Sequence, residues 1–358
     1  MRVVGIDPGT VSIDVCALQD GRLTLDDSLP TATALADLPA FVARIESAGP
    51  VDLVAGPSGY GLPLVSAADV TDDELRLAFL AAEGEPGGIG GIRALARALA
   101  ASGLPVVFTP GVIHLPSVPA HRKVNRVDMG TADKVCAAAL AIAEQAARER
   151  CAVEDVSLIL LELGGAFTAA LAVDGGRIVD GVGWTGGPLG VRSAGALDGE
   201  VAFLAGRVDK ALLFGGGGAT VRGENGSMPA AALADPRSPR EQVAWDAFVE
   251  GAEKAVASLL VSVPRPREVV LSGRMARVAR VREELGRRLS RYAPTRALAG
   301  FARVAKEAAQ GAALIADGLA GGEHARLVEV LGIREARGTV LDHLHVISPD
   351  AARRRLGI

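Results

Sequence analysis

The stretch Gly5-Ile6-Asp7-Pro8-Gly9-Thr10 follows a short apolar run at the start of the chain. A second stretch, Glu162-Leu163-Gly164-Gly165-Ala166-Phe167-Thr168, follows an apolar run in the second half. In each stretch, a predicted strand delivers a carboxylate into a tight turn of small residues. Because glycine has no Cβ atom, the backbone N–H groups of such a turn can approach phosphate oxygens closely. Either stretch alone is equally typical of an ordinary hairpin turn, so the pair is the stronger signal.

Outward from these two turns, the chain repeats one pattern of strands and turns. The first unit predicts strands over residues 2–6, 12–18 and 22–29, and the second predicts them over 156–161, 167–173 and 177–182. Helical spacing of apolar residues predicts the helices 34–47, 128–150, 240–261, 275–289 and 302–320. A repeat of this length favours two similar α/β domains. We expect an N-terminal lobe over 1–127, a connecting helix over 128–155, a C-terminal lobe with the nucleotide site over 156–320, and a polar tail over 321–358.

Composition excludes several classes of function. The chain has 358 residues, 49% hydrophobic residues, 3% aromatic residues and a net charge of −4. A nucleic-acid partner is disfavoured, because such partners usually require a basic surface or aromatic stacking platforms. The most apolar run, 156–173, is interrupted by a glutamate and two glycines, so we expect no membrane span. Three cysteines without CxxC spacing, and a start without an apolar leader, favour a cytoplasmic protein.

A third motif is Val269-Val270-Leu271-Ser272-Gly273-Arg274-Met275, in which a predicted strand ends in small residues before a helix. A nucleotide base or ribose can pack against such a turn at a helix N-terminus. A routine strand-to-helix loop has the same pattern. The basic loop 121–134 is a further candidate, since cationic side chains beside a phosphate site can neutralise a transferring phosphoryl group. We expect Arg126, Asp133 and Lys134 to line the cleft, although a solvated basic loop is equally compatible with the pattern.

In their order and spacing, the three motifs resemble the phosphate 1, phosphate 2 and adenosine motifs of the acetate-and-sugar-kinase/Hsp70/actin superfamily. The segments 187–198 and 306–314 resemble a glycine-proline stretch and a C-terminal helix of butyrate kinases. The nearest resemblance is to the family of predicted butyrate kinases. The pair Asp133-Lys134 is also similar to an active-site element of type III pantothenate kinases. The resemblance implies a two-lobed, actin-like/ribonuclease-H-like ATPase fold of the α/β class, with mixed sheets, flanking helices and an interdomain cleft.

The resemblance also implies ATP and Mg²⁺ as cofactors and a set of site residues. The metal would be held by Asp7 and Glu162, and the catalytic residues would be Asp7, Arg126, Asp133 and Lys134. The nucleotide would contact Gly9, Thr10, Gly164, Gly165, Thr168, Ser272, Gly273 and Arg274. One position departs from the pattern: acetate and butyrate kinases have a histidine where this chain has Glu162. A carboxylate there repels a carboxylate substrate unless a cation lies between them.

We therefore expect an ATP-dependent kinase of a short-chain carboxylate, with a small-molecule acceptor as its partner. Two alternatives remain open. The first is a kinase of a hydroxyl acceptor on the same fold, for which Asp133 would act as the base. The second is a non-enzymatic ATP-binding switch or assembly protein. The sequence also leaves a homodimer open.

Overall fold

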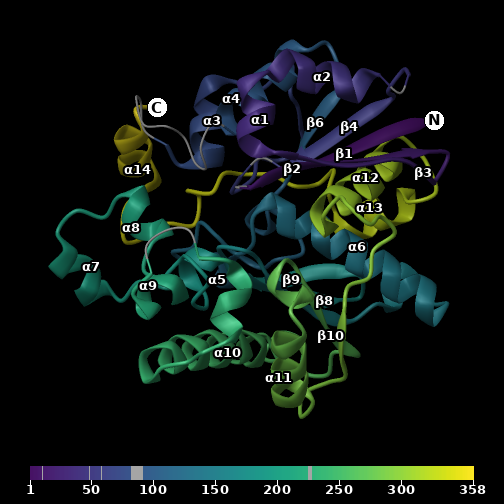
Figure 1. Cartoon of the computed structure of the whole chain (residues 1–358). Helices are drawn as coiled ribbons and strands as arrows, with labels where there is room; N and C mark the ends of the chain where they lie inside the picture. The colour runs from purple at the N-terminus through teal and green to yellow at the C-terminus, as the bar shows by residue number, and fades with distance from the viewer. Residues whose placement is uncertain (10, 48, 58, 82–91, 225–227) are drawn as a thin grey trace.

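The chain folds around two mixed β-sheets, one in each lobe (Figure 1). The computed structural model describes residues 1–358 except 10, 48, 58, 82–91 and 225–227. The first sheet has the strand order β3-β2-β1-β4-β6-β5 and the second has the order β11-β10-β7-β8-β9. The strands of the first sheet are β1 Arg2–Pro8, β2 Ser12–Gln19, β3 Arg22–Pro30, β4 Leu53–Pro57, β5 Val65–Ser66 and β6 Val106–Thr109. Those of the second are β7 Leu158–Leu163, β8 Thr168–Asp174, β9 Arg177–Val182, β10 Glu268–Ser272 and β11 Thr295–Ala297.

The two sheets share one topology, which confirms the repeat predicted from the sequence. In the first sheet β1 pairs antiparallel with β2 and parallel with β4. In the second, β7 pairs antiparallel with β8 and parallel with β10. Every side chain of β7 is buried, as are the first six of β1, because helices cover these central strands. Continuous apolar runs are typical of strands buried on both faces, and this is why both were visible in the sequence.

Helices flank both sheets, so the predicted mixed α/β class is confirmed. In the first half of the chain they are α1 Thr31–Ala36, α2 Leu38–Glu46, α3 Asp72–Phe79, α4 Ile92–Ala101, α5 Ala120–Lys123 and α6 Ala132–Glu149. In the second half they are α7 Gly199–Ala205, α8 Lys210–Phe214, α9 Gly218–Arg222, α10 Pro239–Leu259, α11 Ala279–Leu289, α12 Glu307–Leu319, α13 Ala325–Leu331 and α14 Pro349–Leu356. Short 3₁₀ turns lie at Val112–His114, Val153–Asp155, Trp184–Gly186, Ala230–Ala234 and Met275–Arg277. None of the described helices is both long and apolar enough to cross a membrane.

The helix predicted over 34–47 is two helices, α1 and α2. Asp37 separates them with φ −140° and accepts a hydrogen bond from the backbone N–H of Ala40 at 3.0 Å. Pro39 lies in the first turn of α2, where its missing N–H costs nothing. In the middle of one long helix the same proline would remove a backbone hydrogen bond. The break therefore follows from Pro39 and the capping side chain before it.

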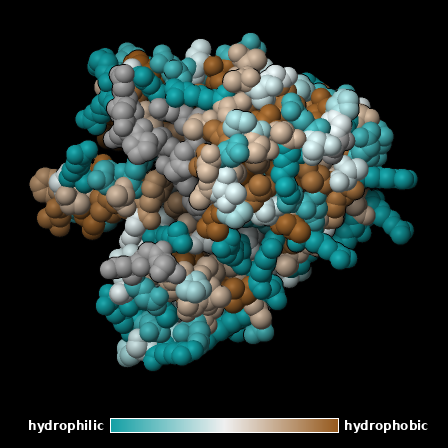
Figure 2. Space-filling model, turned by 45° about the horizontal axis from the view of Figure 1, so that its top comes forward, coloured by the Kyte–Doolittle hydropathy of each residue, from teal (hydrophilic) through white to brown (hydrophobic). Residues whose placement is uncertain are grey.

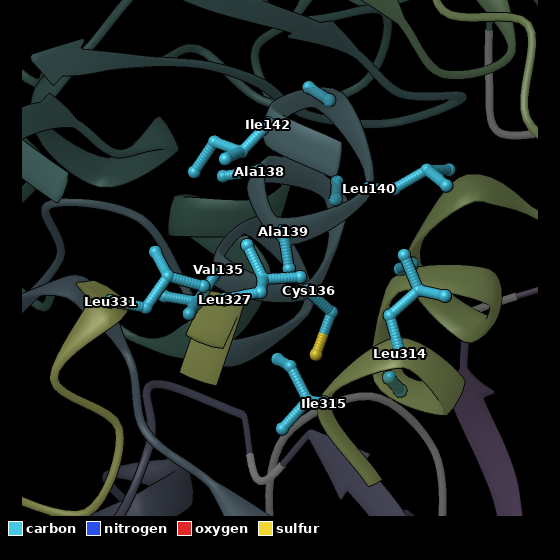
Figure 3. Packing of buried hydrophobic residues seen from close by; sticks show 14 of the residues in the cluster. Val135, Cys136, Ala138, Ala139, Leu140, Ile142, Leu314, Ile315, Leu327 and Leu331 are labelled. Atoms are coloured by element: carbon cyan, nitrogen blue, oxygen red, sulfur yellow. The ribbon is translucent and has the colours of Figure 1, made fainter. Parts of the chain in front are cut away.

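Helices α6 and α12 pack against each other and join the two lobes (Figure 3). Helix α12 contacts β1, β2 and β4 of the first sheet, although it follows the second sheet in the chain. Helix α6 contacts β7 and β8 as well as β4 and β6. Figure 3 shows Cys136 and Ala139 of α6 facing Leu314 and Ile315 of α12. The largest buried cluster is thus shared between the lobes instead of belonging to one of them.

The segment 321–358, expected to be a polar tail, contains α13 and α14 and contributes to the core. Leu327 and Leu331 pack against α6, and Val340 and Leu341 are buried in a separate cluster. The yellow ribbon in Figure 1 runs back across the molecule to α14. The prediction failed because helices of seven and eight residues are too short to give a clear periodic signal.

Helix α7 extends away from the rest of the molecule (Figure 1) and buries none of its side chains. Phe203 and Leu204 are 78% and 79% exposed. Figure 2 shows a projection rich in hydrophobic residues on one side of the molecule. Because Phe203 is so exposed, replacing it should leave the rest of the fold unchanged.

Candidate active site

A pocket between the lobes collects most of the predicted site residues. It lies where β1, β7 and β10 end and where α6 and α12 begin. The predicted residues that line it are Asp7, Gly9, Asp133, Lys134, Glu162, Gly164, Gly165, Ser272, Gly273 and Arg274. The strand and turn repeat therefore brings residues from both halves of the chain to one place.

The two glycine turns have matching backbone geometry. The N–H of Gly9 donates to the carbonyl of Ser12 at 3.0 Å, and the N–H of Gly164 donates to the carbonyl of Phe167 at 2.8 Å. A Cβ atom on Gly9 would lie 2.9 Å from the Lys306 ammonium, and one on Gly164 would lie 2.8 Å from the Phe167 carbonyl. Glycine is required at both turns because the chain passes so close to its neighbours. Thr10, predicted to contact the nucleotide, lies outside the described residues.

On the second turn, Glu162 forms a buried charge cluster with the start of α6. The Lys134 ammonium lies 3.2 Å from Glu162 Oε2 and 2.5 Å from Asp133 Oδ2. Burial raises the pKa of Glu162 to about 7, against the opposing effect of Lys134. The pKa of Asp133 is lowered, since Lys134 and the Thr131 hydroxyl outweigh its burial. Near neutral pH, Asp133 is therefore ionised while Glu162 exchanges a proton easily.

On the first turn, Asp7 has a corresponding cationic neighbour. The Lys306 ammonium, at the start of α12, lies 3.7 Å from Asp7 Oδ2 and 2.5 Å from Asp14 Oδ2. Burial raises the pKa of Asp7 to about 6, although Lys306 acts in the opposite direction. Burial lowers the pKa of Lys306, but Asp7 and Asp14 more than offset it and the net shift is upward. Each turn thus presents one buried carboxylate with a lysine beside it.

Sequence reasoning missed both Asp14 and Lys306. Asp14 is fully buried on the otherwise apolar strand β2 and pairs in register with Asp7 on β1. A charged residue inside an apolar strand is a signal of a buried pair, and it could have been read from the sequence. Lys306 gave no such signal, because only the packing of α12 on the first sheet places it near Asp7. Glu307, which also lines the pocket, lies 3.2 Å from the Arg277 guanidinium.

The loop after β10 lies directly beside the second turn. Ser272 is in register with Glu162 across the parallel pair of β10 and β7. Gly273 has φ +88°, and a Cβ atom there would collide with the Glu162 carboxylate. A Cβ atom on Gly165 would lie 3.3 Å from the Arg274 side chain. The loop predicted to border adenosine and the turn predicted to bind phosphate therefore form one continuous wall.

Two predicted residues do not reach the pocket. Thr168 begins β8 with its side chain buried in the protein, and its hydroxyl has no hydrogen-bond partner among the described residues. Strand alternation turns this side chain away from the turn that precedes it. Arg126 is exposed and its guanidinium lies against Gly186, outside the lining of the pocket. It lies in the loop before α6, and only residues from the start of α6 enter the pocket.

Aromatic rings also line the pocket, and they were not predicted from the sequence. They belong to one of the two tryptophans, one of the two tyrosines and three of the eight phenylalanines: Trp184, Tyr60, Phe79, Phe167 and Phe214. We call these five residues the aromatic end. The ring centroids of Phe167 and Trp184 are 4.4 Å apart, and those of Trp184 and Phe214 are 5.2 Å apart. The five rings come from five separate segments, so no local sequence pattern marks them.

The donor groups present fit Mg²⁺ bound mainly through water. Among the described residues, no group of three or more His, Cys, Asp or Glu side chains is placed to hold a metal ion. Mg²⁺ keeps several of its waters and needs only one or two carboxylates. Asp7 and Glu162 supply two, and both carboxylates line the pocket, each with a lysine ammonium within 4 Å. Burial disfavours the ionised forms of the two carboxylates. A cation bound by Asp7 and Glu162 would favour these ionised forms.

Solved structures with a similar fold are kinases. The propionate kinase from Francisella tularensis subsp. tularensis SCHU S4 matches with a TM-score of 0.60 and 14% identity, over 87% of this chain and 98% of its own. The acetate kinase from Entamoeba histolytica matches with a TM-score of 0.56 and 11% identity, over 81% and 86%. The Listeria monocytogenes protein Lmo2764, described as a candidate N-acetylmannosamine kinase, matches with a TM-score of 0.52 and 13% identity, over 92% and 99%. The chain has the actin-like ATPase fold, as predicted.

The sequence matches one family profile over most of its length. The profile of the family described as protein of unknown function (DUF1464) matches residues 5–346, and the chain belongs to that family. No curated protein matches the sequence. The resemblance to butyrate kinases is not confirmed by this family match.

Proposed function

We propose that this protein is an ATP-dependent phosphotransferase whose acceptor is a carboxylate. One observation carries the proposal: a single pocket is lined both by charged side chains at two glycine turns and by five aromatic rings. The charged side chains suit a nucleotide triphosphate with its metal ion. The aromatic rings suit an acceptor that exposes hydrocarbon. The kinases of similar fold support the reaction class, since phosphoryl transfer relies mostly on positioning and on neutralisation of charge.

In this proposal each glycine turn holds one side of the phosphate chain. The backbone N–H groups around Gly9, Gly164 and Gly165 face the phosphates, and the loop of Ser272 and Gly273 borders the nucleoside. Asp7 and Glu162 would hold Mg²⁺, whose charge offsets that of the phosphates when it is bound. The ammonium groups of Lys134 and Lys306 lie next to these carboxylates and keep the site from accumulating negative charge.

A carboxylate acceptor fits the protonation states in the pocket. A carboxylate oxygen forms a bond to the γ-phosphorus, the bond from that phosphorus to the β–γ bridging oxygen breaks, and the products are an acyl phosphate and ADP. The acceptor is already ionised at neutral pH, so no base has to remove a proton. Asp133, the expected base for an alcohol acceptor, has a lowered pKa and two hydrogen-bonding neighbours. It is therefore a weak base.

A hydroxyl acceptor is the second candidate, and it has one observation in its favour. Burial raises the pKa of Glu162 to about 7, close to the pH at which a general base works best. Against this candidate, the aromatic end offers few side-chain groups that could hydrogen-bond the several hydroxyls of a sugar. The carboxylate is therefore the acceptor that the pocket supports best.

The proposal is tested by a screen for ADP release. Purified protein with ATP and Mg²⁺ is offered short and branched carboxylates in one set, and sugars and pantothenate-like alcohols in another. Acyl phosphate is trapped as its hydroxamate. We expect ADP release with at least one carboxylate and with none of the alcohols. Tight ATP binding without turnover on either set would instead favour the non-enzymatic switch.

We predict that Asp7→Asn lowers turnover at least about 100-fold, because charged groups at a site of phosphoryl transfer typically contribute that much. Circular dichroism and thermal unfolding should show an intact fold. The matched control is Asp174→Asn, at an exposed position at the end of β8. The control should keep full activity. Equal activity of Asp7→Asn and Asp174→Asn would refute the assignment of the site.

A further inference from the structure

We infer that the acceptor carries a bulky apolar group, an aromatic ring or a branched chain, that binds in the aromatic end of the pocket. This inference rests on the proposed function and extends it, because a short acid such as acetate would leave most of that surface without a contact.

Most rings of the aromatic end contact one another and together form a wall of the pocket. Phe167, Trp184 and Phe214 all contact one another, with centroid distances of 4.4, 5.2 and 5.7 Å. Tyr60, from the first lobe, stacks near Trp184 at 6.4 Å with 25° between the ring planes. Phe79 completes the wall from the end of α3. Rings from both lobes therefore surround one space, and an apolar ligand there would contact both lobes at once.

The aromatic rings pack against other buried side chains of the protein. Tyr60 and Trp184 are only 8% and 6% exposed, and they belong to a buried cluster with Leu77, Val340 and Leu341. A wall that is rigid before the ligand arrives selects by size, because little ordering remains to be done on binding.

The loop of Trp184 is also tied to the start of α6. The Asp128 carboxylate accepts hydrogen bonds from the backbone N–H of Thr185 at 3.2 Å and from its hydroxyl at 3.3 Å. The same carboxylate accepts from the N–H of Gly130 at 3.0 Å. Asp128 thus fixes Trp184 relative to α6, whose first turn carries Asp133 and Lys134. One buried side chain therefore positions both a ring and charged residues of the pocket.

Charged side chains that line the pocket are paired at the glycine turns, and the cation that lies over one of the rings is Lys210, whose ammonium is 5.4 Å from the Tyr60 ring centroid. Lys134 pairs with Asp133 and Glu162, and Lys306 pairs with Asp7 and Asp14, so these two ammonium groups are held at the glycine turns. The side chains of the aromatic end are hydrocarbon apart from the Tyr60 hydroxyl and the indole N–H of Trp184. An acceptor with its carboxylate at the glycine turns would thus place its tail against the rings. Burial of a ring-sized tail favours binding by about 50-fold over a methyl group.

A different use of the rings would be to stack the adenine base. The two uses predict different effects of one substitution. If the rings hold the acceptor, Phe214→Ala weakens binding of the acid and leaves ATP binding unchanged. If they hold the base, the same substitution weakens ATP binding and leaves the acids unchanged, and the inference is then wrong.

The test measures binding directly, without turnover. Trp184 and Trp245 are the tryptophans of the chain, so Trp245→Phe leaves Trp184 as the only tryptophan, which is excited selectively at about 295 nm as the reporter. This variant is titrated with phenylacetate, 3-methylbutanoate and acetate, and calorimetry on the natural sequence repeats each titration in case the substitution disturbs folding. We expect phenylacetate and 3-methylbutanoate to bind about 50-fold more tightly than acetate.

The variants decide where the acids bind. We expect Phe214→Ala to weaken phenylacetate binding about 10-fold and to leave acetate binding unchanged. Phe203→Ala, the same substitution at an exposed ring on α7, should change neither. Equal affinity for all three acids, or no binding of phenylacetate, would overturn the inference.

If the bulky acids bind tightly but no ADP is released with ATP and Mg²⁺, the binding site stands and the kinase proposal fails. If ADP is released with equal KM for acetate and phenylacetate, the kinase stands and the inference fails.

Discussion

At the scale of single residues, the candidate active site depends on glycines, because a side chain at these positions would collide with the charged groups beside them. Gly273 has φ +88°, and the space that its Cβ atom would need is filled by the Glu162 carboxylate. Glu162 is in turn held by Lys134. A side chain at position 273 would therefore move a charged group and not merely an apolar neighbour, and the consequence should appear in ligand binding before it appears in folding.

We predict that Gly273→Ala lowers ATP affinity at least about 10-fold, because displacing Glu162 disrupts one side of the phosphate site. Gly103→Ala is the matched control, since Gly103 also has a positive φ, +78°, but nothing lies within 4 Å of the added Cβ. Gly103→Ala should cost about 1 kcal/mol in the free energy of unfolding, from the left-handed backbone. Gly273→Ala should cost more, because its added Cβ atom would also lie 2.6 Å from the Leu163 carbonyl oxygen. Calorimetry with ATP and urea unfolding separate the two effects. Equal ATP affinity in the two variants would contradict the geometry of the site.

A second prediction concerns His114, which is 2% exposed beside the loop that carries Tyr60. Burial lowers its pKa to about 4, so the ring stays neutral in the folded protein where the unfolded chain would bind a proton. For a base with a depressed pKa, stability is lost as pH falls from 6.5 toward 4. Between pH 7.5 and pH 5 we expect His114 to account for a loss of about 2 kcal/mol.

His114→Gln should remove this acid-dependent loss, while His121→Gln, at an exposed position, should retain it. The measurement is the difference in the free energy of unfolding between the two pH values for each variant. An NMR titration of the His114 ring in the natural protein gives an independent check. A ring that titrates near pH 6.5 would show that the site is accessible to water.

The residues that could be predicted from the sequence are those with local signals. Asp7 and Glu162 could be found because each follows an apolar run and precedes glycine. Lys306 could not, since its partners Asp7 and Asp14 lie almost a chain length away. Arg126 was expected in the pocket because it is basic and close in sequence to Asp133. Its position outside the pocket shows that charge and proximity in sequence do not determine which way a loop turns.

At the scale of elements, the strands of the two repeats were predictable and the short helices were not. Strands β1 and β7 are buried almost completely, so their sequences are continuous apolar runs. Helix α2 was merged with α1 in the prediction, because Pro39 can either start a helix or break one. Helices α13 and α14 were taken for a polar tail. These helices are short, and their apolar residues pack against partners that are distant in sequence: α13 in the cluster that contains α6, and α14 in the cluster that contains Tyr60 and Trp184.

At the scale of the whole molecule, the lobes are joined where α6, α12 and the first sheet come within backbone contact. A Cβ atom on Gly5 of β1 would collide with the backbone of α12, and one on Gly311 of α12 would collide with the carbonyl of Cys136 on α6. Because Lys306 lies at the start of α12 and Lys134 at the start of α6, this close packing also sets the distance between the two charge clusters of the site.

We predict that Gly311→Ala destabilises the protein by about 3 kcal/mol, because it forces apart two helices that touch through their backbones. Gly286→Ala is the matched control in the interior of α11, where the added Cβ meets nothing within 4 Å. That substitution should stabilise the protein by about 0.5–1 kcal/mol, the helix preference for alanine over glycine. Urea unfolding of both variants gives the values. Equal stability of the two would contradict the packing of α6 against α12.

The sequence by itself determined the two-fold strand repeat, the α/β class and the carboxylate at each glycine turn, because these rest on local rules of burial and backbone freedom. Only the tertiary structure decided which cations meet those carboxylates and where the aromatic rings gather. The physical reason is that ion pairing and ring packing act between residues that are distant along the chain. Their energies depend on spatial separation, which no local pattern in the sequence encodes.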